Sequence, residues 1–331
     1  MKNITALTVL VIILSAITSK FPLSGQELKK ERNYTLSIAP QFGILDGEAL
    51  EIVYPTVEKG ELLSELIWEM NPLFYWGAGL DYSLIEPMKR PGFFSALSIK
   101  AGFPGETGKM EDRDWQSIEN GALTNFSSHT NITEDFFCLD ISMGISIPVG
   151  NLFLFKTFIG GSWMNLSFTG RDGHGIYARG NPRDSGKYFP MDDNPDRRSF
   201  NGRVITYSQE WLILSAGAGI GIGFLEHFLL DLSFQISPLT FCYAEDNHIL
   251  TRYTYIDISR FGIFLEPRCK LSFTPVGWLG LSLDFAYRQI GPAKGESFYR
   301  VGSSGGYHKS ENRVGAGLSL LDYGLSVKVI F

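Results

Sequence analysis

Apolar and polar residues alternate along most of this chain. In the stretches 34–42, 139–147 and 279–288, nearly every second position is apolar, and mostly small or polar residues lie between. Successive side chains of a strand point to opposite faces, so this alternation predicts β-strands with one apolar and one polar face. The sequence therefore predicts an all-β protein.

Two architectures share this pattern, a soluble β-sandwich and a membrane-spanning β-barrel. The alternating runs reach about ten residues or more, which matches a tilted strand that crosses a bilayer. The polar face is rich in Gly and Ser, as expected of a wet lumen, and an alternating strand at 323–331 closes on Phe331. That ending resembles the ending of bacterial outer-membrane barrels. Together these features favour the barrel.

The connections between the alternating runs predict the topology. Counting strands between short turns and top connections gives about ten antiparallel strands, with the short turns on the periplasmic side. On this count the third and seventh strands both end at the extracellular rim, near Trp115 and His248, and face each other across the mouth. The short turns lie at about 86–91, 148–151, 225–228 and 275–277, the long loops at 117–133, 173–199 and 291–312, and tighter top connections at 58–61 and 249–252.

Composition narrows the compartment and the partners. Residues 1–25 hold a basic start and an apolar run, which predicts a secretory signal peptide and leaves 26–331 as one barrel domain. The net charge of -6, with no basic stripe, predicts no nucleic-acid partner. The three cysteines are scattered and match neither a disulfide framework nor a zinc spacing. We expect no metal and no other cofactor.

Two pairs of chemically competent residues stand at the ends of the third and seventh predicted strands. Asp112 and Asp114 are two residues apart, and so are Asp246 and His248. Residues at this spacing on a strand share a face, so we expect all four to converge at the mouth. Two close carboxylates can share a proton, and an Asp beside a His orients the ring and raises its basicity. The arrangement suits a water held between the pairs, with His248 taking its proton as the water attacks a carbonyl.

With these motifs in this order, the chain resembles the omptins, the outer-membrane proteases of Gram-negative bacteria. The resemblance covers nearly the whole mature chain. It implies a ten-stranded antiparallel transmembrane β-barrel in the outer membrane, an active site on the extracellular side, peptide or protein substrates, and catalysis by Asp112, Asp114, Asp246 and His248. The matching motifs are Gly108…Met110-x-Asp112-x-Asp114-Trp115, Asp246-x-His248, Glu51-x-Val53-Tyr54 and Ser167-Phe168-Thr169-x-Arg171.

The substrate-binding positions depart from the family pattern. Omptins build a pocket for a basic side chain from a Glu and an Asp. Glu51 matches the Glu, whereas the Asp position falls on Ala244, with Glu245 adjacent. A further acid in the neighbouring subsite is replaced by Asn125. We therefore expect a less anionic pocket than the family's.

The outer wall departs from the family pattern as well. In omptins a Glu-x-Arg pair there helps to hold lipopolysaccharide. In this chain the two positions are Trp163 and Asn165. Contact with outer-membrane lipid is expected of any such barrel, but dependence on lipopolysaccharide is not implied.

The seventh strand presents a conflict of parity. Its apolar residues from Leu230 to Ile236 face outward, and counting by twos from them reaches Asp246 and His248. A bulge must therefore switch the alternation if the catalytic pair is to face the lumen. Pro238 is the natural position for that bulge.

Other interpretations of these residues stay open. Asp112 and Asp114 also fit ordinary rim charges or calcium ligands, and Glu51 fits a solvated rim acid. The alternative function is a catalytically weak or inactive barrel that acts as a surface adhesin or binding protein. A passive porin is disfavoured because ten strands leave a lumen largely filled by side chains. A surface lipase is disfavoured because the sequence shows no Ser–His pairing.

Overall fold

A computed structural model describes residues 34–55, 62–84, 90–116, 122–178, 196–303 and 305–331. The predicted signal peptide, 1–25, lies outside the described residues. Within them, no helix is long and apolar enough to cross a membrane. The strand segments are β1 (Tyr34–Tyr54), β2 (Ser64–Leu84), β3 (Gly92–Gly102), β4 (Gly105–Asp114), β5 (Asn125–Val149), β6 (Phe153–Tyr177), β7 (Asp196–Ser199), β8 (Arg203–Phe224), β9 (Phe228–His248), β10 (Tyr253–Arg260), β11 (Phe264–Val276), β12 (Leu279–Val301) and β13 (His308–Ile330).

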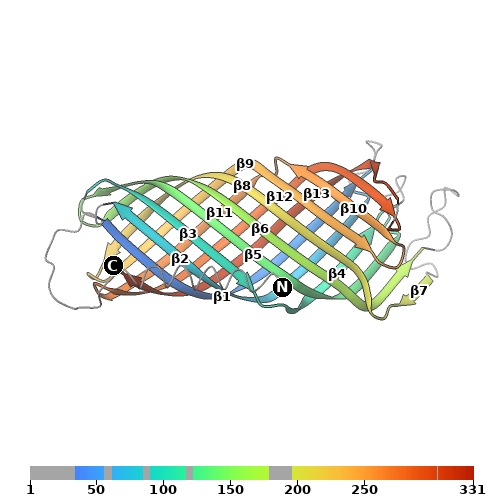
Figure 1. Ribbon diagram of the computed structural model, residues 1–331, viewed down its shortest axis with the longest axis horizontal. Helices are drawn as coiled ribbons and strands as arrows, with labels where there is room; N and C mark the ends of the chain where they lie inside the picture. Colours follow the sequence, from blue (N-terminus) through green and yellow to red (C-terminus); the bar gives the residue numbers. More distant parts are fainter. Residues whose placement is uncertain (1–33, 56–61, 85–89, 117–121, 179–195, 304) are drawn as a thin grey trace. The chain divides into compact units, whose positions relative to one another are not determined.

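The segments form a closed antiparallel ring of ten strands, as predicted. β3 and β4 both pair with β2 and β5, so they are one strand interrupted at 103–104. In the same way β10 and β11 share the partners β9 and β12, and β7 continues β8 along β6. Pairing of β1 with β13 closes the ring, and the ribbon shows the resulting barrel (Figure 1).

The two ends of the barrel differ as the sequence predicts. The turns after β5, β8 and β11 are short, and they lie at the same end as the C-terminus, on the left of Figure 1. The predicted connections at 58–61 and 86–89 lie outside the described residues.

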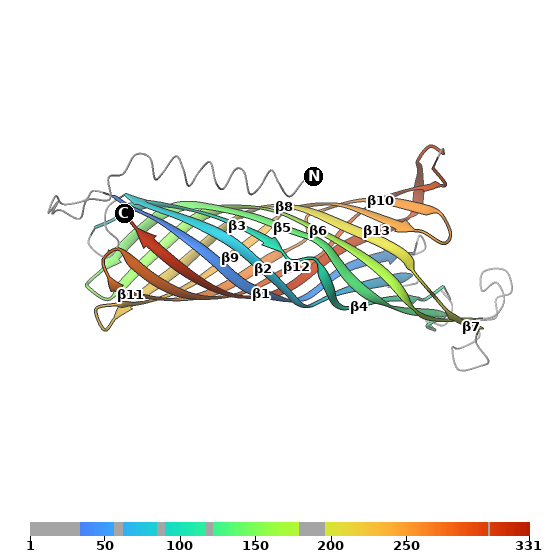
Figure 2. The same cartoon turned by 60° about the horizontal axis from the view of Figure 1, so that its bottom comes forward.

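The opposite end extends further as strand than predicted. The long-loop predictions were wrong for 125–133, 173–177, 196–199, 291–301 and 308–312, which belong to β5, β6, β7, β12 and β13. β5 and β6 each hold 25 residues, far more than the roughly 9–11 that cross a bilayer. These extensions project beyond the apolar belt, so they carry many polar residues on both faces. Their composition therefore resembles that of a loop. Figure 2 shows the strands continuing to β7 and β10 at this end.

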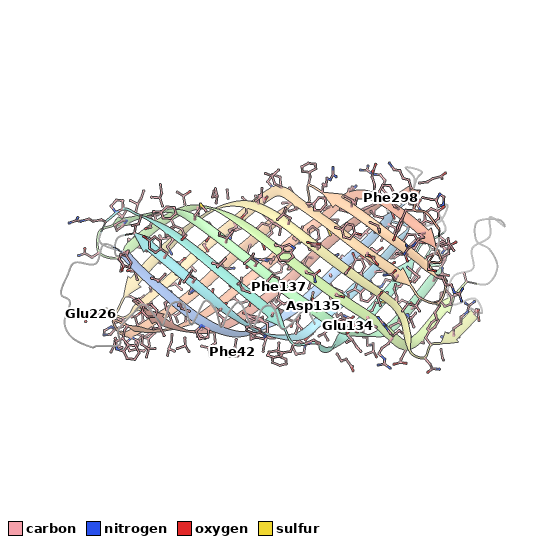
Figure 3. The ribbon with its side chains drawn as sticks, in the orientation of Figure 1. Phe42, Glu134, Asp135, Phe137, Glu226 and Phe298 are labelled. Atoms are coloured by element: carbon pink, nitrogen blue, oxygen red, sulfur yellow. The ribbon has the colours of Figure 1, made fainter. Side chains whose placement is uncertain are left out.

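The outer wall carries an apolar belt that ends in charged residues. Ile145, Ile159 and Leu214 are 52%, 61% and 58% exposed, as expected of side chains that contact lipid. Toward the β7 end this belt gives way to outward acids, and Figure 3 shows Glu134 and Asp135 next to Phe137 on the wall. Everything beyond this boundary, including the ends of β4 and β9, lies outside the membrane-spanning part.

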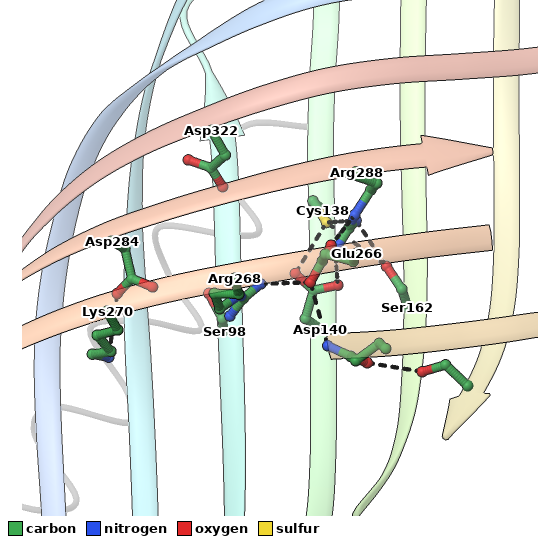
Figure 4. A network of polar contacts seen from close by, with 12 residues as sticks. Ser98, Cys138, Asp140, Ser162, Glu266, Arg268, Lys270, Asp284, Arg288 and Asp322 are labelled. Atoms are coloured by element: carbon green, nitrogen blue, oxygen red, sulfur yellow. Dashed lines mark hydrogen bonds and ion pairs between the residues drawn. The ribbon is translucent and has the colours of Figure 1, made fainter. Parts of the chain in front are cut away.

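A network of buried charges lies in the lumen of the spanning part. The Arg288 guanidinium donates to Glu266 at 2.6 Å, to Asp140 at 3.0 Å and to Ser162 at 3.2 Å. Arg268 donates to the same Glu266 carboxylate at 2.9 Å (Figure 4). Each buried charge therefore has an opposite partner, as burial requires.

Stacked aromatic rings lie between this network and the end of the barrel at which β4 and β9 finish. Trp68 is fully buried, and its ring stacks on Phe168 at 5.6 Å and on Tyr207 at 5.4 Å between centroids. Trp68 pairs with Ala49 of β1, two residues below Glu51. The stacked rings therefore support the site above them.

The parity conflict on β9 is resolved by a bulge at the expected position. Leu239 pairs with Leu214 and Ile236 pairs with Ala216, so β9 holds two residues, Ser237 and Pro238, opposite one residue of β8. Burial alternates in one phase up to Ile236 and in the opposite phase from Thr240 onward. The prediction of a switch at Pro238 is confirmed, and it turns Asp246 toward the lumen.

Candidate active site

Asp246 and His248 end β9 as a tightly bonded pair. The Asp246 Oδ2 atom lies 2.6 Å from His248 Nε2. Asp246 is 2% exposed, whereas the His248 side chain is 35% exposed, so the acid is fixed below a reachable imidazole. The Tyr255 ring meets the imidazole edge-on, with 5.6 Å between the ring centroids, and further restricts its rotation. With Nε2 bound to the carboxylate, Nδ1 is the nitrogen that can accept a proton.

Asp112 and Asp114 end β4, and neighbouring strands hold them in place. Asp112 pairs with Leu66 of β2 in the ladder, and Ser64 of the same strand lines the cavity beside it. Asn125 of β5 pairs with Asp114 in the ladder, and its Nδ2 donates to Asp114 Oδ2 at 3.0 Å. Asn125, predicted as a substrate-binding residue, thus contacts a predicted catalytic acid.

All four predicted catalytic residues line one cavity of about 210 Å³. β4 and β9 supply them from separate parts of the ring, as the strand count predicts. Glu51 of β1 and Asp257 of β10 also line this cavity. We call it the acidic cavity, and its described lining residues are Glu51, Val53, Leu63, Ser64, Leu66, Asp112, Asp114, Gln116, Asp246, His248, Tyr255, Asp257, Ser297, Ser310, Asn312 and Val314.

Burial and mutual repulsion keep protons on this cluster. Burial, reinforced by Asp114, raises the pKa of Asp112 to about 8. Burial opposes charge on His248, but the Asp246 carboxylate outweighs it and raises the pKa of His248 to about 9. Burial and the charge of Asp246 raise the pKa of Glu51 well above its usual range. Burial also raises the pKa of Asp257 to about 7.

Asp257 is an acid of the cavity that the sequence analysis missed. It pairs directly with Ala244 across the β9–β10 ladder, so the two side chains share a face. Asp257 is 5% exposed and Ala244 is 1% exposed. The expectation of a less anionic pocket rested on Ala244 and Asn125, and the structure adds a carboxylate from the strand next to Ala244.

The other predicted binding positions fall elsewhere. Glu245 has the opposite parity to Asp246 on β9, does not line the acidic cavity, and accepts a hydrogen bond from Asn247 at 3.0 Å. On the outer wall the Trp163 indole donates to Glu210 at 2.8 Å, and Asn165 donates to Asp135 at 3.4 Å. The two positions that align with the lipid-binding pair are therefore bonded to acids.

A Ser–His contact lies beside the Asp pair and was not predicted. Ser127 pairs with Asp112 in the ladder, and its hydroxyl lies 3.0 Å from His129 Nε2. His129 is buried, and its Nδ1 lies 2.5 Å from the Asp172 carbonyl. The sequence analysis placed this segment in a loop, so the shared face of Ser127 and His129 was not recognised.

Comparison with solved structures identifies the fold. The outer membrane protease OmpT from Escherichia coli matches with a TM-score of 0.78 and 21% identity, over 93% of this chain and 100% of that one. Two autotransporter domains match at lower scores. One is the translocator domain of NalP from Neisseria meningitidis, with a TM-score of 0.32 and 9% identity over 99% of this chain and 97% of that one. The other is the transport unit of AIDA-I from Escherichia coli, with a TM-score of 0.36 and 10% identity over 95% of this chain and 96% of that one.

The family is established by sequence. No curated protein matches the chain significantly. The family model described as "Omptin family" matches residues 32–331, a range that includes every described residue. The chain therefore belongs to the omptin family of proteases, and it lies in the bacterial outer membrane with its active site on the extracellular side.

Proposed function

We propose that this protein is a surface endopeptidase in which a water molecule attacks the peptide bond. The Asp112–Asp114 pair holds the water on one side, and the His248–Asp246 dyad activates it on the other. The observation that carries the proposal is the convergence of these four side chains on one acidic cavity at the extracellular end.

The chemistry follows from the contacts of the dyad. The water oxygen attacks the carbonyl carbon while His248 Nδ1 takes a proton, and Asp246 stabilises the resulting imidazolium through the 2.6 Å contact at Nε2. His248 then returns the proton to the leaving amide nitrogen, and the C–N bond breaks. The bond to Asp246 fixes the ring throughout, so the base stays aimed at the water.

The Asp pair is suited to bind a neutral molecule between acids. Within the described residues, Asp112 Oδ1 is buried without a hydrogen-bond partner, and so is Asp246 Oδ1. Each of these oxygens can accept a hydrogen bond from water. Because the pKa of Asp112 is raised to about 8, its protonated form can also donate one.

The test is cleavage of a mixed-sequence peptide library by refolded protein in lipid vesicles, read by mass spectrometry. We expect His248→Ala to lower kcat by a factor of about 10²–10⁴, the usual contribution of a positioned base. His227→Ala, which removes an imidazole at a periplasmic turn, is the matched control and should cleave like the wild type. Peptide binding without cleavage by the wild type would instead support the adhesin.

A further inference from the structure

Three tyrosines and a histidine form a compact group of rings beside the dyad. The ring centroids of Tyr253 and Tyr255 lie 5.9 Å apart, and each lies 6.3 Å from the centroid of Tyr299. The His308 ring continues the group at 5.9 Å from Tyr299. We call these four residues the aromatic cluster. Because Tyr255 also meets His248 edge-on, the cluster begins at the proposed base and extends over β10, β12 and β13.

The strand register turns the aromatic cluster toward the mouth of the barrel. Tyr255 pairs with Asp246 across the β9–β10 ladder and with Tyr299 across the β10–β12 ladder. Tyr299 pairs in turn with His308 of β13. Ladder partners share a face, so the cluster lies on the same face as the dyad. The aromatic girdles of membrane barrels face lipid, and that role therefore does not explain these rings.

The rings of the aromatic cluster keep exposed surface, unlike the rings deeper in the barrel. Trp68 and Phe168 are each 0% exposed, whereas the three tyrosines of the cluster are half-buried and its histidine is exposed. Sites that bind organic ligands typically combine aromatic walls with a few placed polar groups. Partly exposed rings on the face of the dyad have the character of such a wall.

The aromatic cluster adjoins the acidic cavity on the side of the solvent. Tyr255 lines the cavity itself, as do Asp257 and Ser297. Asp257 lies two residues deeper than Tyr255 on β10, and its ladder partner Ser297 lies two residues deeper than Tyr299 on β12. Two residues of a strand span about 6.6–6.8 Å, and an extended peptide repeats its side chains at the same spacing. A side chain close to a peptide bond held at the dyad therefore reaches the rings.

We infer that the aromatic cluster is a substrate subsite that takes an aromatic side chain close to the scissile bond. The inference rests on the proposed function and adds a subsite whose chemistry differs from that of the acidic cavity. An aromatic side chain packs against Tyr253 and Tyr299 in offset or edge-on geometry, and the contact removes apolar ring surface from water. His308 borders the subsite on the side of β13.

The experiment first locates the position that the subsite reads. A peptide library varies each position on either side of the bond that refolded wild type cleaves, and we expect Phe, Tyr and Trp to be enriched at one of them. Two peptides that carry Phe or Ala at that position are then compared by their kcat/KM values. Burial of a Phe side chain predicts a ratio of roughly 10- to 100-fold in favour of Phe.

Three variants assign this preference to the cluster. Tyr299→Ser removes one ring outside the dyad and should lower the Phe-to-Ala ratio by about 2- to 12-fold, which corresponds to the energy of one aromatic pair. Tyr299→Phe keeps the ring and should keep the ratio. Tyr34→Ser is the matched control, because it removes an exposed ring that stacks on Tyr82 at 6.4 Å near the opposite end of the barrel, and it should leave the ratio at the wild-type value.

The outcomes separate this inference from the proposed function. If wild type cleaves no peptide, the proposed function fails and the inference fails with it. If wild type cleaves without aromatic enrichment at any position, or if a folded Tyr299→Ser variant slows the Phe and Ala peptides equally, the protease stands and the aromatic subsite is overturned.

Discussion

Replacing Asp246 by Asn tests the dyad with little change of shape. The substitution keeps the side chain that lies 2.6 Å from His248 Nε2 but removes its charge and can impose the wrong tautomer on the imidazole. Asp246 is 2% exposed, so water cannot replace the lost carboxylate. A positioned base contributes about 10²–10⁴ in rate, so we expect kcat to fall by a factor in that range.

The pH dependence gives this variant a second signature. In the wild type the base form of His248 grows as pH rises through its pKa of about 9, so kcat/KM should rise between neutral pH and that value. Burial alone lowers the pKa of His248, and Asp246 is the strongest influence that raises it. In Asp246→Asn the inflection should therefore move to lower pH.

The assay is hydrolysis of a fluorogenic peptide by refolded protein from pH 6 to 10, with barrel folding verified by heat-modifiable gel mobility. Asp135→Asn, an acid on the outer wall, is the matched control and should keep the wild-type profile. A folded Asp246→Asn variant that retains more than a third of wild-type kcat, with its inflection unmoved, would refute the dyad.

Three other perturbations address how the site is positioned. Asn125→Ala removes the 3.0 Å hydrogen bond to Asp114; a bond to a charged group is worth about 1.5–3 kcal/mol, so kcat/KM should fall roughly 10- to 100-fold, and unchanged kinetics would show that Asp114 needs no such support. Deleting Pro238 removes the bulge and should turn the dyad outward, abolishing cleavage; a folded deletion variant with full activity would contradict the parity argument. Arg288→Met leaves Glu266 and its neighbours without a partner, which should destabilise the barrel by about 3–5 kcal/mol in urea unfolding, while an unchanged midpoint would show that the network is dispensable.

Much of the fold could be predicted because the environment constrains it twice. Lipid outside and a polar lumen inside require every spanning strand to alternate apolar and polar residues. Stretches such as 139–147 can therefore be predicted as strands from the one sequence. Polar pairs at spacing two, such as Asp112 and Asp114, stand out against that alternation. The bulge in β9 was predictable for the same reason. Its lipid-facing apolar residues and the Asp246–His248 pair lie at positions of the same alternation, so they can face opposite sides only if a bulge lies between them.

The rest depended on information that one strand does not contain. Beyond the membrane both faces of a strand can be polar, so the extracellular ends of β5 and β12 resemble loops in composition. The buried contact between Ser127 and His129 lies in one of these ends and was therefore not predicted. Asp257 belongs to no motif and lies in an ordinary alternating strand. Only the register between β9 and β10, which pairs it with Ala244, reveals that it lies in the cavity.

A substrate pocket in a barrel is therefore defined by a level of the ladder and by the face that a side chain occupies. At one level any of several neighbouring strands can supply a charge, because ladder partners on one face bring their Cβ atoms within about 4.5–5.5 Å. Ala244 carries no charge, yet this level of the cavity still holds a carboxylate because its ladder partner is Asp257. The face is the stricter requirement, since Glu245 is adjacent to Asp246 in sequence yet lies outside the cavity. The residues that line such a cavity should accordingly be sought through cross-strand pairs as well as through motifs of the sequence.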